Sequence, residues 1–126
     1  MAKAATKQST SVEATQRLQA VAGAVAGDES VETSRLLYDR IRLGIMSALS
    51  VNRTMSFAEL KELLATTDGN LSKHARRLED AGLVSCKKAF AERVPRTQFN
   101  LTAKGKRAFA KHLEHMEALI EATREE

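Results

Sequence analysis

The chain has 126 residues and a net charge of +4, and 43% of its side chains are hydrophobic but only 4% aromatic. This length suits one domain with a tail, and a core rich in Leu, Ile, Val and Ala favours packed helices over a β-sandwich. One cysteine excludes an intramolecular disulfide, and the sequence shows neither a signal peptide nor the ~20 apolar residues that span a bilayer, so we expect a cytoplasmic protein with no membrane partner.

Residues 1–33 are rich in Ala, Ser, Thr, Gln and Gly and carry few larger apolar side chains. Loosely spaced valines allow a helix from about 12 to 26, which Gly23 and Gly27 weaken. We expect an N-terminal arm that is mobile or partly helical, followed by one domain over residues 34–126.

An amphipathic helix is predicted to begin at Ser34. Apolar side chains recur there at spacings of three and four, and charged side chains occupy the rest of the turn. The apolar positions are Leu37, Tyr38, Ile41, Ile45, Ala48 and Leu49. Gly44 interrupts this helix at a cost of about 1 kcal/mol relative to Ala, which indicates a close helix crossing. A loop over 52–54 follows.

Two helices joined by a tight turn are predicted next. Ser56 and Glu59 have the spacing of a capping box, which begins the first of these helices. Thr67 or Asp68 then caps the second helix, which spans residues 67–81. Helix, tight turn and helix form a helix-turn-helix unit.

The helix over 67–81 has an apolar edge and a basic face. Leu71, Ala75 and Leu78 fall within about 60° of one another on a helical wheel and should face the core. The opposite side carries side chains suited to base edges and phosphates: Asn70, Ser72, Lys73 and Arg76, with Arg77 at the margin. The alternative is an ordinary solvated helix face.

A β-ribbon, called the wing below, is predicted over residues 84–102. Alternating apolar and polar side chains up to Leu101 are typical of a half-buried strand. Arg93 and Arg96 flank the tip, where either can enter a minor groove or contact a phosphate. The alternative is that one of them pairs with Glu92.

Positive charge is concentrated where this helix and the wing lie. Residues 72–107 hold ten Lys or Arg side chains against three Asp or Glu, whereas residues 1–71 are balanced and residues 108–126 are net acidic. A surface that binds a polyanion requires such a concentration. Helix and wing together predict a domain that grips duplex DNA, with the helix in the major groove and the wing on the adjacent minor groove or backbone.

A last helix is predicted after Thr102, with an apolar stripe along it. We expect this stripe to form a dimer interface, because so small a domain does not bury it all. Its residues are Phe109, Leu113, Met116 and Ile120. The alternative is packing of the stripe on the helix that begins at Ser34.

Several short motifs, in this order along the chain, resemble one family. The basic helix with its exit and the wing with its return are similar to those of MarR and ArsR winged-helix regulators. In the helix and its exit the matching residues are Leu71-Ser72-Lys73-His74-Ala75 and Glu79-Asp80-Ala81-Gly82-Leu83-Val84. In the wing and its return they are Arg93-Val94-Pro95-Arg96-Thr97 and Phe99-Asn100-Leu101-Thr102. They look especially like the minimal "winged helix DNA-binding domain" proteins, over about residues 36–120. The departure is Ala75, where such families usually place leucine, so the core behind this helix should be thinner.

The resemblance implies a mainly α (α+β) winged helix-turn-helix, with three helices, a two-stranded β-wing and a C-terminal helix. It also implies a homodimeric, prokaryotic-type transcriptional regulator that binds double-stranded DNA at a pseudo-palindromic operator, and it leaves any effector ligand unidentified. The runner-up is a winged-helix protein–protein module without DNA binding. An enzyme is not expected, because the sequence has no phosphate loop, nucleophile elbow, carboxylate pair or catalytic triad.

The histidines and the cysteine do not predict a metal site or a cofactor. His112 and His115 have a spacing that can supply two zinc ligands, as the resemblance to ArsR metal sensors suggests, but no acid or histidine stands near residues 99–101 to complete such a site. We therefore expect this pair to face solvent. His74 is expected to be half-buried and bonded to backbone, and Cys86 to be a small apolar filler on a strand facing the core.

Overall fold

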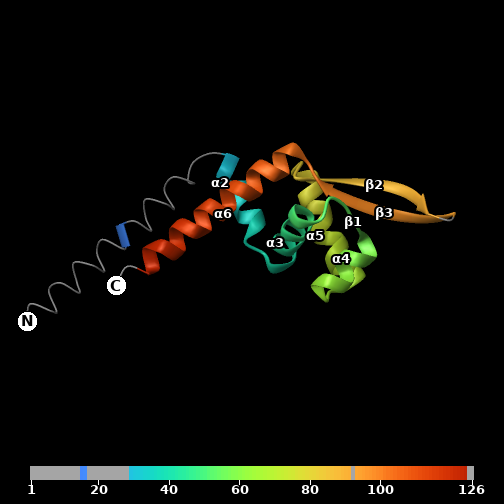
Figure 1. Cartoon of the computed structure of the whole chain (residues 1–126), viewed down its shortest axis with the longest axis horizontal. Coiled ribbons are helices and arrows are strands. Elements are labelled where there is room, and N and C mark those ends of the chain that lie inside the picture. Colours follow the sequence, from blue (N-terminus) through green and yellow to red (C-terminus); the bar gives the residue numbers. More distant parts are fainter. Residues whose placement is uncertain (1–14, 17–28, 92, 125–126) are drawn as a thin grey trace, which may run out of the picture.

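Three short helices form the body of the fold, with a β-ribbon on one side and a long helix leaving on the other. The computed structural model describes residues 15–16, 29–91 and 93–124. In chain order the described elements are α2 (Glu29–Leu37), α3 (Arg40–Val51), β1 (Met55–Ser56), α4 (Phe57–Leu64), α5 (Asp68–Asp80), β2 (Val84–Ala91), β3 (Val94–Leu101) and α6 (Ala103–Thr123). Helices α3, α4 and α5 form the body, and α2 lies beside α6 (Figure 1).

The helix predicted from Ser34 is two helices in the structure, so that prediction was wrong in one respect. Tyr38 and Asp39 separate α2 from α3. Asp39 has extended backbone, and its Oδ1 accepts hydrogen bonds from the backbone N–H groups of Ile41 and Arg42 over 2.9 and 3.0 Å. The apolar spacing continues across this break, which is why periodicity alone does not reveal it. Asp39 is the N-cap of α3, although the hydrophobic periodicity continues through it without interruption.

The helix-turn-helix forms as its capping residues predict. Ser56 Oγ accepts from the Glu59 N–H, and Glu59 Oε1 accepts from the Ser56 N–H, which confirms the capping box that begins α4. Thr67, not Asp68, caps α5 through its hydroxyl. Asp68 instead pairs with Lys61 of α4 over 2.8 Å, across the turn. The first turn of α5 is therefore held by the Thr67 cap and by the ion pair of Asp68 with α4.

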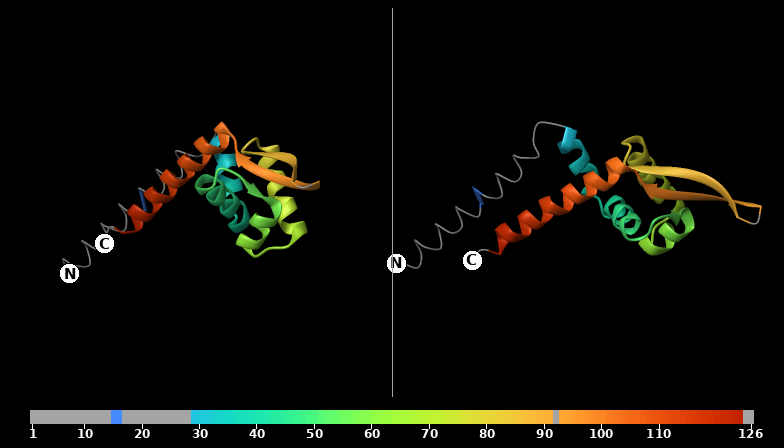
Figure 2. Two further views of the ribbon diagram at one scale, coloured as in Figure 1. Left: turned by 45° about the vertical axis from the view of Figure 1, so that its right-hand side comes forward. Right: turned by 45° about the horizontal axis from the view of Figure 1, so that its top comes forward.

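The wing belongs to an antiparallel sheet with strand order β1-β3-β2. Strands β2 and β3 pair along their whole length, from Val84 opposite Leu101 to Ala91 opposite Val94. Strand β1 is only two residues long, pairs with β3 opposite Phe99, and was not predicted from the sequence. Figure 2 shows the ribbon reaching well beyond the helices, so its tip stands free of the body.

Gly105 allows α6 to pack directly against the link between α5 and β2. A Cβ at Gly105 would overlap the carbonyl oxygen of Leu83 and lie 2.9 Å from its carbonyl carbon. The same Leu83 oxygen accepts from the backbone N–H of Thr102 over 3.1 Å. The Thr102 hydroxyl donates to the Gly82 oxygen over 2.6 Å, with the Leu83 oxygen farther away at 3.1 Å, and caps α6. Gly82 ends the preceding helix in left-handed backbone, with φ of 79°. The end of α5, the base of the wing and the start of α6 are therefore packed directly against one another at Leu83, and we call this contact the joint.

The core lies between α3, α4, α5, the base of the wing and α6. Its largest fully buried side chains are Leu37, Ile45, Met46, Leu60, Leu71, Leu78, Leu83 and Val84. Gly44 confirms the predicted close crossing, since a Cβ there would lie 2.5 Å from a methyl group of Leu64 on α4. Leu78 of α5 belongs to the same buried cluster as Val84 of β2 and Phe99 of β3, so the orientation of α5 and that of the wing depend on the same core.

This architecture is a winged helix fold of mainly helical class, as predicted. Helix α2 begins at Glu29, ahead of the boundary expected at residue 34, and packs against α6. Of the helix expected from about 12 to 26, Thr15 and Gln16 are helical, and the rest lies outside the described residues. Among the helices that the structure describes, none is both long and apolar enough to cross a membrane.

Candidate nucleic-acid interface

Helix α5 has the two faces that its sequence predicts. Leu71, Ala75 and Leu78 are buried, and the helix packs against α3, α4 and β2. The candidate residues for DNA contact are all exposed: Asn70, Ser72, Lys73, Arg76 and Arg77. Burial of one edge thus fixes the direction in which the other edge presents its polar side chains.

The cations on this face are available for a partner. Across residues 29–91 and 93–124, neither Lys73 nor Arg76 nor Arg77 forms an ion pair. Asn70 is partly engaged, because its Nδ2 donates to Thr66 Oγ1 over 2.9 Å in the turn before α5. Three cations on about one and a half turns of helix form a surface that can accept phosphates.

The two wing arginines are exposed as well. Arg93 lies at the tip with φ of 68°, a left-handed conformation that is uncommon for a side-chain-bearing residue. Arg96 lies nearer the body, close enough for its charge to act on Glu59 of α4. The backbone hydrogen bond from Ser56 is the main reason that the pKa of Glu59 is lowered, and the charge of Arg96 lowers it further. Glu92, the alternative partner, falls outside the described residues.

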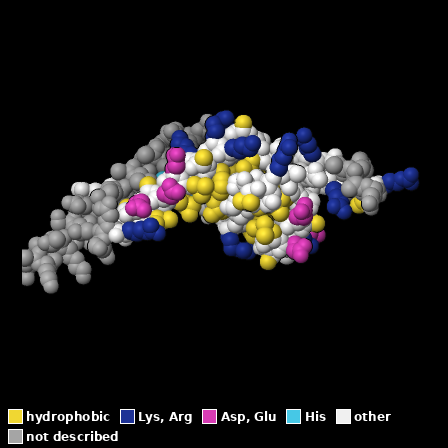
Figure 3. Space-filling model, in the orientation of Figure 1, with side chains coloured by type: hydrophobic (Ala, Val, Ile, Leu, Met, Phe, Trp, Pro, Cys, Tyr) yellow, Lys and Arg dark blue, Asp and Glu magenta, His cyan; other side chains and the backbone are white. Residues whose placement is uncertain are grey.

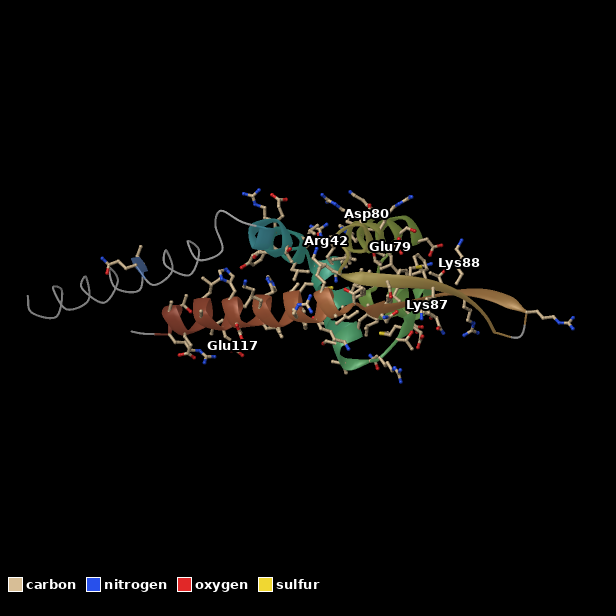
Figure 4. The ribbon with its side chains drawn as sticks, turned by 90° about the horizontal axis from the view of Figure 1, so that it is seen from above. Arg42, Glu79, Asp80, Lys87, Lys88 and Glu117 are labelled. Carbon is tan, nitrogen blue, oxygen red and sulfur yellow. The ribbon has the colours of Figure 1, made fainter. Side chains whose placement is uncertain are left out.

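Further basic side chains lie on the ribbon. Lys87 and Lys88 are exposed neighbours on β2, and the strand pleat directs them to opposite sides, as Figure 4 shows. Lys and Arg side chains line the upper rim of the molecule and the far end of the wing, whereas acidic ones occur along α6 and around α4 (Figure 3). We call the following set the basic face: Asn70, Ser72, Lys73, Arg76 and Arg77 of α5, with Arg93 and Arg96 of the wing.

His74 lies behind the basic face and differs from its prediction. It is buried, and its Nδ1 lies 2.9 Å from Nη1 of Arg42, a side chain on α3, instead of bonding to backbone. Asp39 Oδ1 is 3.7 Å from the same nitrogen. The reason is that α5 crosses α3 here, and the buried Arg42 needs an acceptor. Sequence reasoning missed both Arg42 and Asp39, since an arginine on a helix is ordinarily solvated.

The expectation that His112 and His115 both face solvent was wrong for His112, and His115 is half-buried. His112 is only 4% exposed, and within the described residues neither of its ring nitrogens has a hydrogen-bond partner. Its ring meets that of Tyr38 edge-to-face, with centroids 4.9 Å apart, because α2 covers this side of α6. Burial, and then the charge of His115, lower the pKa of His112. The described residues contain no group of His, Cys, Asp and Glu that could hold a metal ion.

Cys86 is partly buried and packs against the core, as predicted. Burial, and then the neighbouring charge of Glu79, raise the pKa of its thiol. A raised pKa leaves little thiolate near neutral pH, so the structure offers no reactive cysteine.

The apolar stripe of α6 is divided between the core and the surface. Phe109 is buried within its own chain, so it is a core residue of this fold and not part of an exposed face. Met116 is half-buried, and Leu113 and Ile120 remain 43% and 46% exposed. A hydrophobic strip runs along α6 on the face that Figure 3 presents. Tyr38, in the break between α2 and α3, adds a further exposed ring.

Comparison with known proteins agrees with this architecture. A family model described as "Winged helix DNA-binding domain" matches residues 41–120, which include every element from α3 to most of α6. An uncharacterized protein of Methanocaldococcus jannaschii is 36% identical over 73 residues, which are 58% of this chain and 79% of that protein.

Solved structures give the same result. A transcriptional regulator homologue from Pyrococcus horikoshii OT3 is 33% identical, with a TM-score of 0.68 over 77% of this chain and 99% of that chain. A transcriptional regulator from Thermotoga maritima is 23% identical, with a TM-score of 0.58 over 73% of this chain and 67% of that chain, and this likeness concerns the fold alone.

Proposed function

Since the chain belongs to the family of winged helix DNA-binding domains, we propose that it is a transcriptional regulator that binds double-stranded DNA sequence-specifically as a homodimer. The observation that carries this proposal is the basic face: exposed cations on a helix that is otherwise anchored in the core, beside a ribbon that also bears arginines. The relative from Pyrococcus horikoshii, named a transcriptional regulator homologue, supports the regulatory role.

Helix α5 is proposed to enter the major groove. Its exposed edge offers Lys73 and Arg76 as donors to guanine or to phosphates, and Ser72 and Asn70 as shorter polar contacts. Arg77, farther round the helix, is assigned to the DNA backbone. Because phosphate contacts position a protein and base contacts specify a sequence, this helix would do both.

The wing, β2 and β3, is proposed to lie on the adjacent minor groove or backbone. Arg93 at the free tip suits insertion into a narrow minor groove, whose negative potential attracts arginine. Arg96, nearer the body, suits a phosphate closer to α4. The two arginines would then extend the contact beyond the groove that α5 occupies.

The homodimer is proposed to form through α6. Leu113, Met116 and Ile120 provide an apolar face that the described fold leaves partly open, and Tyr38 borders it. In a twofold dimer the same patch serves both subunits. Leu113→Glu should therefore shift the protein toward monomer in analytical ultracentrifugation, whereas Lys111→Glu, at an exposed charged position of α6, should not. Equal sedimentation of the two variants would contradict this interface.

The DNA-binding proposal is tested by fluorescence anisotropy with a random-sequence duplex at several salt concentrations. Neutralising phosphates gives a slope of log affinity against log salt of about −0.9 for each contact. Lys73→Ala combined with Arg76→Ala removes four cations from a dimer, so the slope should become shallower by roughly 3.6 if each contacts one phosphate. Arg35→Ala combined with Lys111→Ala removes the same charge from α2 and α6 and is the control.

The outcomes separate the two candidate functions. Equal slopes for the two double variants would show that α5 is not the DNA-binding helix. Absence of salt-dependent binding by the unaltered protein would favour a winged-helix protein–protein module instead. Duplexes selected from a random library should contain half-sites about one helical turn apart if a dimer binds. A regulator acts where the genome lies, which in a prokaryotic cell is the cytoplasm.

A further inference from the structure

A single buried guanidinium joins the end of α2 to the middle of α5. The Arg42 Nε donates to the carbonyl oxygen of Leu36, in the last turn of α2, over 2.5 Å. Its Nη1 donates to His74 Nδ1 over 2.9 Å. Figure 4 shows Arg42 where α2, α3 and α5 meet. Arg42 is 9% exposed and His74 8% exposed, so both contacts lie in an environment that strengthens electrostatic interactions.

The geometry fixes the protonation state of the histidine. Arginine can only donate hydrogen bonds, so His74 Nδ1 must be unprotonated in this arrangement, and the ring proton lies on Nε2. Asp39 Oδ1 stands 3.7 Å from the same Nδ1. A proton added at Nδ1 would remove the acceptor that Arg42 uses and create a donor that faces Asp39.

The other side of the same junction contacts α6. Tyr38, adjacent to Asp39, packs edge-to-face on His112 and lies 6.4 Å, between ring centroids, from His115. The two-residue break between α2 and α3 is thus in contact with the proposed dimer helix through Tyr38. Through Asp39 and Arg42 it is in contact with the proposed DNA-reading helix.

We propose that this junction, formed by Tyr38, Asp39, Arg42 and His74, is an acid-sensitive coupling between the α2–α6 arm and the recognition helix, with Arg42 and His74 as positioning residues. The inference rests on the proposed DNA-binding function. Neutral His74 holds α5 to the end of α2, in the orientation that presents the basic face. Protonated His74 releases Arg42 and turns to Asp39, so specific DNA recognition weakens.

The charges around His74 favour the neutral form near pH 7. Burial is the largest cause that lowers the pKa of His74, and the charges of Arg42 on α3 and of Lys73 and Arg77 on α5 lower it further. Asp39 opposes them. A lower pH than an ordinary histidine requires is therefore needed to charge the ring, and the imidazolium then lies beside a buried guanidinium.

The experiment measures the specificity ratio, defined as the affinity of the full chain for a duplex selected at pH 8 divided by that for a random-sequence duplex. General gains in positive charge on acidification strengthen both affinities and cancel in the ratio. The ratio is measured from about pH 8 to about pH 5.5 at fixed ionic strength, with circular dichroism confirming that the protein stays folded. For the unaltered protein it should fall about tenfold, within the range common for coupled sites.

Two variants assign the effect. His74→Asn places an amide oxygen near the position of Nδ1 and cannot titrate, so its specificity ratio should be independent of pH. Arg42→Lys keeps the charge but cannot reach both Leu36 and His74 with a planar fork, so it should lower the ratio about tenfold at pH 8. The control is Arg40→Lys, an exposed arginine on the same helix, which should behave as the unaltered protein.

A constant ratio for the unaltered protein, or an equal fall in the His74→Asn variant, would overturn the proposal; the second result would point to another group, such as His112. A readout without DNA keeps this test separate from the proposed function. In NMR titrations, amide signals of α5 and of the last turn of α2 should move together with the His74 ring signal, and not in His74→Asn. Independent movement of the two helices would also overturn it, even if DNA did not bind.

Discussion

Replacing Gly105 by Ala should destabilise the protein although alanine is the better helix former. Gly105 lies in the first turn of α6, where a Cβ would overlap the carbonyl oxygen of Leu83. That oxygen belongs to the backbone link between α5 and β2 and also accepts a hydrogen bond from the Thr102 backbone N–H. No side-chain rotation can relieve the overlap, so α6 must move away from the link.

The magnitude follows from three contributions. Alanine gains about 1 kcal/mol of helix propensity over glycine. Overpacking costs typically 1–3 kcal/mol, and here the upper part of the range applies, because backbone meets backbone. Displacing α6 also weakens the hydrogen bond from the Thr102 N–H to Leu83, which is worth about 1 kcal/mol. The net loss is about 3 kcal/mol, which lowers the melting temperature of a domain this size by roughly 10 °C or more.

Two other helical glycines serve as matched controls in thermal denaturation at one protein concentration. A Cβ added at Gly69 on α5 would meet no atom within 4 Å, so Gly69→Ala should raise stability by up to about 1 kcal/mol. Gly44 faces the movable end of Leu64, so Gly44→Ala should fall between the other two. If Gly105→Ala melts at or above the unaltered protein, the joint between α5, the wing and α6 is not rigid and the reasoning fails.

Three further predictions concern single groups. Ser56→Ala removes the capping box of α4 and should cost about 1 kcal/mol in chemical denaturation, whereas Ser56→Asp should cost less. Burial opposes ionisation of Asp39, but hydrogen bonds from the Arg42 and Ile41 backbone and the charges of His74 and Arg42 lower its pKa below the ordinary value of 3.8. The ionised carboxylate therefore stabilises the fold fully above pH 3.8, and this stabilisation is lost as the pH falls through the lowered pKa. Asp39→Asn should therefore reduce the free energy of unfolding more at pH 7 than at pH 3, and a difference independent of pH would contradict this. Cys86 should react with a thiol reagent much more slowly in the folded than in the urea-unfolded protein, because the pKa of its thiol is raised; equal rates would exclude this.

The parts of the fold that sequence could predict are those set by neighbours along the chain. Ser56, Thr67 and Thr102 cap helices through N–H groups three residues away, so their role is visible in the local pattern. The direction of the basic face was also predictable. Once Leu71 and Leu78 are assigned to the core, helical geometry alone directs Lys73 and Arg76 outward.

The parts that could not be predicted depend on contacts between distant residues. Strand β1 exists because Met55 and Ser56 happen to meet β3, more than forty residues away. The break at Tyr38 and Asp39 preserves the apolar spacing, so a pattern of hydrophobicity reads it as one helix. Its reason is tertiary: α2 must turn to cover α6 while α3 enters the core.

The two buried histidines show why the exposed residues of the candidate site could be predicted from the sequence, whereas the buried contacts beneath them could not. Periodicity reports whether a position faces inward, but it does not report what a polar side chain finds there. His74 occurs at an inward position of α5 and is stabilised there by Arg42, a residue 32 positions away. His112 occurs on α6 and finds only an aromatic edge from Tyr38 among the described residues. His74 thus has a hydrogen-bond partner and His112 has none among the described residues, and burial disfavours the charged form of both rings. Under the two proposals, the basic face would respond to acidification through His74, a residue that does not itself touch DNA.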